Sequence, residues 1–132
     1  MKALDTNILV RFLVRDDEKQ AQVVYDLFKR TESARGILFI PLVVVLETIW
    51  VLESVYTISR GEIIDTFREL LSMPLLKFES QPAVQAFVSS AMNTSADLAD
   101  LLIGQSAHHS GCESLLTLDK RAAKSPLFEL LR

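Results

Sequence analysis

The sequence predicts an α/β protein in which a mostly parallel sheet lies between helices. Short apolar runs alternate along the chain with longer stretches whose apolar residues recur at helical spacing. Strands that are separated by helices in this way form parallel sheets with helices on both faces. The chain has 132 residues, enough for one sizeable core but too few for two, so we expect a single domain over residues 1–132.

The first part of the chain reads as two strand-and-helix units. Residues 1–4 are a short, mostly apolar run, and the amphipathic segment 7–14 follows directly. The acidic run 16–18 favours the start of a second helix, which Gly36 is expected to end. The apolar run 37–40 is typical of a strand that is buried on both faces.

The rest of the chain continues this alternation. Pro41 stands where a helix can begin, and we expect that helix over residues 42–56. Ser59 and Glu62 have the spacing of a capping box for the next helix, which Pro74 ends. The remaining strands are expected at residues 75–78 and 114–118, and the remaining helices at 82–92 and 96–110, the last of them closed by Gly111.

Two acids directly follow predicted strands. Asp5 and Asp119 each come after an apolar run, and the carboxyl ends of parallel strands meet at one edge of a sheet, where such proteins bind ligands. An ordinary turn or N-cap role would also explain either residue.

Three further acids lie within predicted helices. Glu47 has valines and a tryptophan as helical neighbours, so we expect it on a buried apolar ridge, paired with an arginine or bound to a metal ion. Asp97 and Asp100 share one helix face. Asp97 lies in the first turn, where favouring the helix dipole would suffice as a role, whereas Asp100 is deeper and is the better candidate ligand.

Clustered carboxylates without cations would repel one another unless a positive ion lay among them. Oxygen-only ligands indicate Mg²⁺ or Mn²⁺, and the Cys and His spacing of zinc sites is missing. His108 and His109 are adjacent near a helix C-terminus, where histidine is favourable in any case. There is no phosphate-binding glycine loop or Ser/His/Asp set, which leaves metal-assisted hydrolysis or transfer at phosphorus.

The net charge of −3 argues at first against a nucleic-acid partner. The five candidate acids, however, belong to a total of 17, and the remaining 12 are outnumbered by 14 basic residues. Basic residues that soon follow the two strand ends are placed to flank a phosphate backbone, although scattered solvated charges would explain them equally: Arg11, Arg15, Lys120, Arg121 and Lys124.

The apolar content bears on location and partners. The longest apolar run, 37–46, is too short to span a membrane, and no export signal opens the chain, so we expect a cytoplasmic protein with no membrane contact. Cys112 is expected to be a small core residue in a reducing setting. Hydrophobic residues make up 49%, which predicts a partner-covered surface, first sought at residues 8–13 and 62–71.

Four motifs follow one another in order along the chain: Leu-Asp-Thr-Asn-Ile-Leu, the acid in Val-Leu-Glu-Thr, Asp-Leu-Ala-Asp-Leu-Leu-Ile, and Leu-Thr-Leu-Asp-Lys. In these the chain resembles the PIN-domain nucleases, and in particular the small VapC-like toxins of type II toxin-antitoxin systems. The resemblance implies a three-layer PIN-like fold with a central, mostly parallel sheet of four to five strands flanked by helices. It also implies Mg²⁺- or Mn²⁺-dependent endoribonuclease activity on RNA, an antitoxin whose tail covers the active-site groove, and pairing into a homodimer.

The family's functional residues are carried over by position. Its catalytic and metal-binding acids match four residues, the second of which binds directly or through water: Asp5, Glu47, Asp100 and Asp119. Asp97 matches an additional, supporting acid, and polar companions that orient carboxylates or water match Thr6, Asn7 and Thr117. Leu118 stands where an aromatic residue is frequent, a departure that affects no ligand.

Two other functions share these features. A non-catalytic PIN-like module that binds RNA or protein typically lacks part of the acid set, all of which this chain retains. A metal-dependent DNA nuclease would use the same chemistry, but such proteins generally add helical elements for which 132 residues leave little room.

Overall fold

The computed structural model describes residues 1–132 and contains six α-helices and five short strands. All five strands are paired in parallel. The predicted α/β class with parallel strands is therefore confirmed, but the expected single sheet of four to five strands is not formed. The chain forms two compact units, an N-terminal unit, Met1–Glu79, and a C-terminal unit, Ser80–Arg132. The five strands are divided into a sheet of three and a sheet of two.

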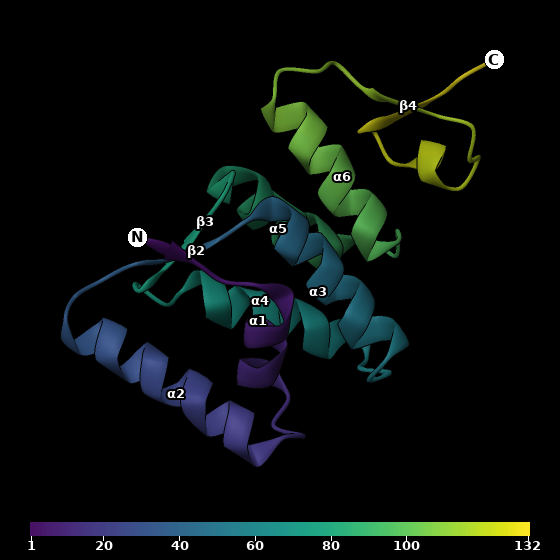
Figure 1. Ribbon diagram of the computed structural model, residues 1–132. Helices are drawn as coiled ribbons and strands as arrows, with labels where there is room; N and C mark the ends of the chain where they lie inside the picture. The colour runs from purple at the N-terminus through teal and green to yellow at the C-terminus, as the bar shows by residue number, and fades with distance from the viewer. The chain divides into compact units, whose positions relative to one another are not determined.

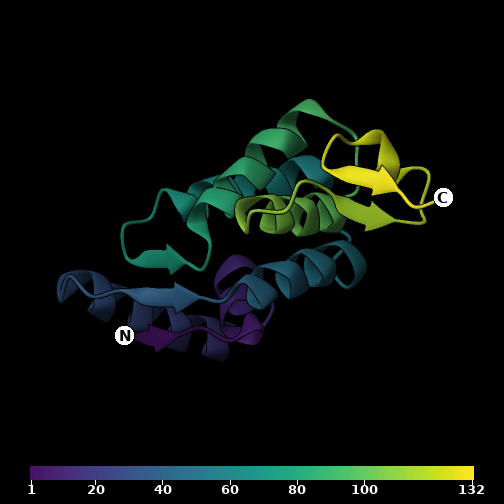
Figure 2. The same cartoon turned by 90° about the horizontal axis from the view of Figure 1, so that it is seen from above.

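The N-terminal unit holds the three-stranded sheet and four helices (Figure 1). Its elements are β1 (Lys2–Ala3), α1 (Thr6–Leu13), α2 (Glu18–Ser33), β2 (Leu38–Ile40), α3 (Leu42–Ser54), α4 (Arg60–Leu71) and β3 (Leu76–Phe78). The strand order is β1-β2-β3, and Leu38 of β2 pairs with Lys2 on one side and Leu76 on the other. The first strand is thus an edge strand of its sheet, beside β2 (Figure 2).

Helix α1 packs against two other helices of the N-terminal unit. It contacts both α2 and α3, and the rings of Phe12 and Phe28 stack with their centroids 4.2 Å apart. Apolar residues from both segments that we expected to meet a partner are instead buried in the core: Leu9, Val10, Ile63, Ile64, Phe67 and Leu70. Most of the apolar surface of these two segments is therefore already covered within the monomer.

Local signals set most helix ends in this unit. Ser59 Oγ accepts a hydrogen bond from the Glu62 N–H at 3.3 Å, as the capping-box spacing predicted. The prediction for Gly36 was wrong in detail. Helix α2 ends at Ser33, and Arg35 takes the left-handed conformation, with φ of 52°. The helix thus ends three residues before the glycine.

The C-terminal unit consists of α5 (Gln81–Asn93), α6 (Leu98–His109), β4 (Leu115–Thr117), a short 3₁₀ turn η1 (Ala122–Lys124) and β5 (Phe128–Leu130). Strands β4 and β5 lie side by side, with the C-terminus just beyond β5 (Figure 2). Strand β5 was not expected from the sequence. It forms where Gly104 of α6 lets the chain approach, because a Cβ on Gly104 would lie 3.0 Å from Phe128 Cε2 and 3.2 Å from Leu127 Cβ.

Gly111 has φ of +96°, which confirms the left-handed cap after α6. No helix has both the length and the apolar character that a membrane span requires. Cys112 is exposed, so the prediction of a core cysteine was wrong, and the reason is its place in the turn after α6 rather than within an element.

Candidate functional site

Asp5 stands at the junction of β1 and α1. The preceding residue, Leu4, is buried, and its N–H donates to the Phe39 carbonyl at 2.8 Å, which extends the pairing of β1 with β2. Asp5 then caps α1, and its Oδ1 accepts a hydrogen bond from the Asn7 N–H at 3.3 Å. The N-cap role is therefore real. The carboxylate is nevertheless exposed and has no salt bridge, so it remains accessible to a ligand.

The companions of Asp5 have different environments. Thr6 is buried, whereas the Asn7 side chain is exposed. Asn7 orients the Asp5 carboxylate through its backbone amide rather than through its side chain. Its amide side chain is thus available for another contact.

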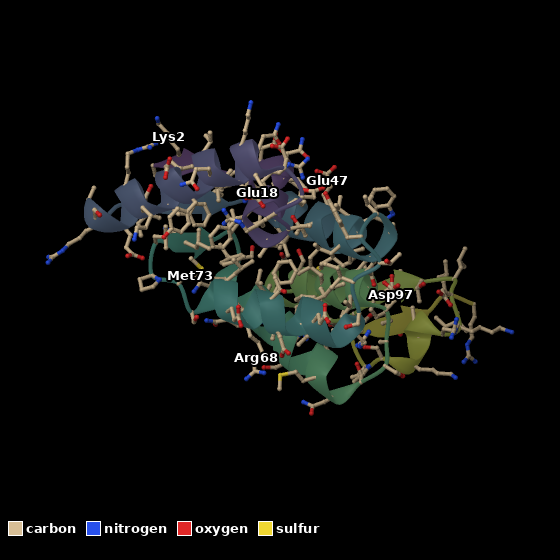
Figure 3. All side chains as sticks on the ribbon, turned by 90° about the horizontal axis from the view of Figure 1, so that it is seen from below. Lys2, Glu18, Glu47, Arg68, Met73 and Asp97 are labelled. Atoms are coloured by element: carbon tan, nitrogen blue, oxygen red, sulfur yellow. The ribbon has the colours of Figure 1, made fainter.

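Glu47 does not lie where we expected it. The prediction of a buried apolar ridge was wrong, because Glu47 is exposed together with Val43 at 72% and Trp50 at 61% (Figure 3). The core side of α3 is formed by other residues: Val44, Val45, Thr48, Ile49 and Leu52. Because α3 is apolar nearly all round, the residue types alone did not reveal which side faces the core. Glu47 has no salt bridge to an arginine.

The acids of the C-terminal unit are held by local hydrogen bonds. Asp97 is the N-cap of α6, and its Oδ1 accepts from the Asp100 N–H at 3.0 Å, so the helix begins at Leu98 rather than at residue 96. Asp119 follows β4. Its N–H donates to Thr117 Oγ1 at 3.0 Å, and its Oδ1 accepts from the Arg121 N–H at 2.8 Å. Thr117 therefore holds the backbone that presents the Asp119 carboxylate.

The electrostatic environment of Asp100 is unfavourable to its charge. Partial burial, and then the charges of Asp97 and Asp119, raise the pKa of the Asp100 carboxyl. None of the three forms a salt bridge, unlike Asp16 with Arg11 and Asp65 with Arg68. Asp100 thus lies near two like charges and has no ion-pair partner of its own.

The donor chemistry fits a hard divalent cation. The candidate ligands are carboxylates that lack salt bridges, and such oxygen donors suit Mg²⁺ or Mn²⁺. A cation would also offset the charges of Asp97 and Asp119, which raise the pKa of Asp100 in addition to the larger effect of its partial burial. The structure contains no group of three or more His, Cys, Asp or Glu side chains close enough to hold a metal ion.

The basic residues fall into two groups. Arg11 is engaged within the N-terminal unit, where its guanidinium donates to Gln20 Oε1 at 2.7 Å, Asp16 Oδ1 at 3.0 Å and the Tyr56 hydroxyl at 3.2 Å. The other four are exposed: Arg15, Lys120, Arg121 and Lys124. No sequence pattern revealed this hydrogen-bonded group of side chains, because its members, from residue 11 to residue 56, are far apart along the chain.

A shallow, largely apolar groove runs between α1 and α2 beside Asn7. Its floor and walls are formed by residues from both helices: Asn7, Ile8, Arg11, Lys19, Gln20, Val23 and Val24. Val23 is 68% exposed, so this part of α2 leaves apolar surface uncovered.

Comparison with known proteins adds an independent finding. The model of the PIN domain family matches residues 2–126, which include every candidate acid. A VapC ribonuclease from Aquifex aeolicus (strain VF5) is 25% identical to this chain over 124 residues, a similarity that spans 94% of this chain and 91% of that protein.

Proposed function

Because the chain belongs to the PIN domain family, we propose that it is a metal-dependent endoribonuclease toxin that hydrolyses RNA phosphodiester bonds and is neutralised by a cognate antitoxin. The observation that carries this proposal is the similarity to a VapC ribonuclease along 94% of the chain. The unpaired acids support it, because a nuclease of this kind needs carboxylates whose charges are not already matched by arginine or lysine.

We assign the catalytic and metal-binding roles to Asp5, Glu47, Asp100 and Asp119, with Glu47 acting directly or through water. Mg²⁺ or Mn²⁺, when bound, would supply a water-derived nucleophile at neutral pH and offset the charge that develops on the phosphate. The Asn7 amide orients Asp5, and Thr117 holds the backbone of Asp119. We further assign phosphate contacts of the substrate to Arg15, Lys120 and Arg121, and to Arg11 to the extent that its own hydrogen bonds allow.

The test is the substitution Asp5→Asn, which keeps the shape of the side chain and its capping oxygen but removes the charge. We expect metal-dependent RNA cleavage to be abolished, because the ligand set loses a negative charge. Asp65→Asn, an exposed acid of α4 that pairs only with Arg68 at 3.4 Å, is the matched control and should cleave like the wild type.

The assay compares RNA and DNA of the same sequence in Mg²⁺, in Mn²⁺ and in EDTA. RNA cleavage that EDTA stops supports the proposal. Preferential cleavage of DNA would assign the chain to the DNA nucleases, and binding of RNA without cleavage would make it a non-catalytic module. Full activity of Asp5→Asn would remove Asp5 from the site.

The proposed antitoxin and homodimer can each be related to the surface of the chain and tested. The apolar groove beside Asn7 is a suitable place for an antitoxin segment, because it is open and lies next to the residue that orients Asp5. Co-expression with the protein of the neighbouring reading frame, followed by co-purification and a cleavage assay, tests this. Sedimentation of the isolated chain tests the proposed homodimer, and a chain that stays monomeric at high concentration would contradict it.

A further inference from the structure

The outer face of α3 carries an aromatic side chain that nothing in the fold uses. Trp50 is 61% exposed and is the one tryptophan of the chain. It follows Glu47 by three residues, and side chains at that spacing are neighbours on a helix, with Cβ atoms about 5–6 Å apart. An indole ring and a proposed active-site carboxylate are thus adjacent on the surface of α3.

This exposure is unfavourable for the isolated chain. Tryptophan is among the side chains that gain most from leaving water, and burial of its ring removes about 150–250 Å² of surface. Ile49 and Leu52 of the same helix are almost completely buried, whereas Trp50, which lies between them in sequence, is exposed. The core of the fold therefore does not use the tryptophan side chain. A ligand or partner that covers the ring would recover this free energy.

A second copy of the chain is an unfavourable occupant of this face. In a two-fold interface the same patch meets itself, so two copies of Glu47 would be buried close together. Glutamate is depleted from the cores of protein interfaces, and helix α3 has no lysine or arginine to pair with it. Repulsion between the two carboxylates would oppose the apolar gain from Val43 and Trp50.

The face of a nucleic-acid base can stack on an indole. The phosphate next to that base would then lie on the side of Glu47, where the divalent cation of the proposed function would offset the repulsion between the two anions. We propose that Trp50 is a substrate-binding residue that stacks on an RNA base adjacent to the scissile phosphate. This inference rests on the proposed ribonuclease function. Because a base must leave its own stack to reach the indole, Trp50 selects single-stranded or looped RNA over duplex RNA.

The fluorescence of Trp50 provides a direct test, since no other tryptophan contributes. The probe is a short single-stranded oligoribonucleotide of mixed sequence, titrated in Mg²⁺ into the Asp5→Asn chain so that cleavage does not interfere. We expect saturable quenching of the tryptophan emission. The same oligonucleotide annealed to its complement should quench less.

Affinity measurements on variants separate stacking from general RNA attraction. Trp50→Ala should bind the single strand about 5- to 150-fold more weakly, and Trp50→Phe, which keeps an aromatic face, should retain most of the affinity. Tyr25→Ala is the matched control, because Tyr25 is another exposed aromatic residue, 40% accessible and on α2, and its removal should leave the affinity unchanged.

Two results would overturn the inference. One is unquenched emission together with wild-type affinity in Trp50→Ala. The other is emission that responds to protein concentration but not to RNA, with Trp50→Ala converting a dimer to a monomer, which would assign the face to a second copy. Quenching and weaker Trp50→Ala binding in a chain that cleaves no RNA would refute the proposed nuclease while keeping the stacking contact.

Discussion

Acidic residues have opposite environments in two clusters, one in each unit. The Asp16 cluster consists of Arg11, Asp16, Gln20 and Tyr56 in the N-terminal unit, and the Asp100 cluster consists of Asp97, Asp100 and Asp119 in the C-terminal unit. Asp16 accepts hydrogen bonds from Arg11 at 3.0 Å and from the Tyr56 hydroxyl at 2.8 Å. Its charge is matched, and the cluster joins the start of α2 to α1 and to the segment after α3. An acid arranged in this way supports the fold.

Asp100 has the contrary environment. Burial and the nearby charges of Asp97 and Asp119 raise its pKa, and no cation is paired with it. An arrangement that opposes ionisation does not help the fold, and perturbed pKa values of this kind are typical of functional sites. The difference suggests a criterion for this protein, in which matched acids are structural and unmatched acids are candidates for the reaction.

The same comparison changes the interpretation of Arg11. Hydrogen bonding to Tyr56, and further the charge of Asp16, raise the pKa of the Arg11 guanidinium above its usual value, although partial burial acts against them. Its donors are already directed at Gln20, Asp16 and Tyr56. Arg15, which is exposed, is the more available of the two for a phosphate contact.

The largest expected effect is a difference in RNA cleavage between variants of Asp100 and of Asp16. Asp100→Asn should lower RNA cleavage by at least about 100-fold, because a charge that acts in the reaction is lost. Asp16→Asn should retain most of the activity and lose stability instead. Cleavage rates and thermal unfolding of both variants test this, and the criterion fails if Asp16→Asn is the less active of the two.

An intermediate effect concerns the hydroxyl that completes the Asp16 cluster. Tyr56→Phe removes a donor to Asp16 and an acceptor for Arg11, so we expect it to lower the free energy of unfolding by about 1 kcal/mol. Tyr25→Phe is the control and should change the stability by less than about 0.5 kcal/mol. Urea unfolding measures both, and equal stabilities would show that the cluster is not structural.

The smallest effect is a dependence on pH. The pKa of Asp100 in the folded chain is raised above its ordinary value of 3.8. At pH values above 3.8 this carboxyl is therefore protonated in a larger fraction of folded chains than of unfolded chains. Its contribution to stability is therefore present at low pH and is lost as the pH rises through the folded pKa.

We accordingly expect the free energy of unfolding of the wild type, relative to Asp100→Asn, to fall as the pH rises above 3.8. The change should stay below about 1 kcal/mol, because solvent screens partly exposed charges. Urea unfolding at a series of pH values measures it. A difference that grows with pH would mean that Asp100 is stabilised as a carboxylate, like Asp16.

Several elements were predictable because their signals are local. The capping oxygen of Ser59, the left-handed Gly111 and the apolar run that became β2 each depend on residues within one turn or one strand. The candidate acids were also found locally, by their position after a strand or at the start of a helix. Asp5 and Asp97 do act as N-caps, and this role is compatible with the proposed one.

The residues by themselves predicted the alternation of helices with the first four strands and the parallel pairing, and they suggested the candidate acids, since periodicity and capping act over a few positions. Tertiary structure decided what depends on distant neighbours. It placed Glu47 and Trp50 on the exposed side of a helix that is apolar nearly all round, and it matched Asp16 with Tyr56 across 40 positions of sequence. It also packed β5 against Gly104. The need for a residue without a Cβ at this position depends on packing between two separate segments, which local sequence does not reveal.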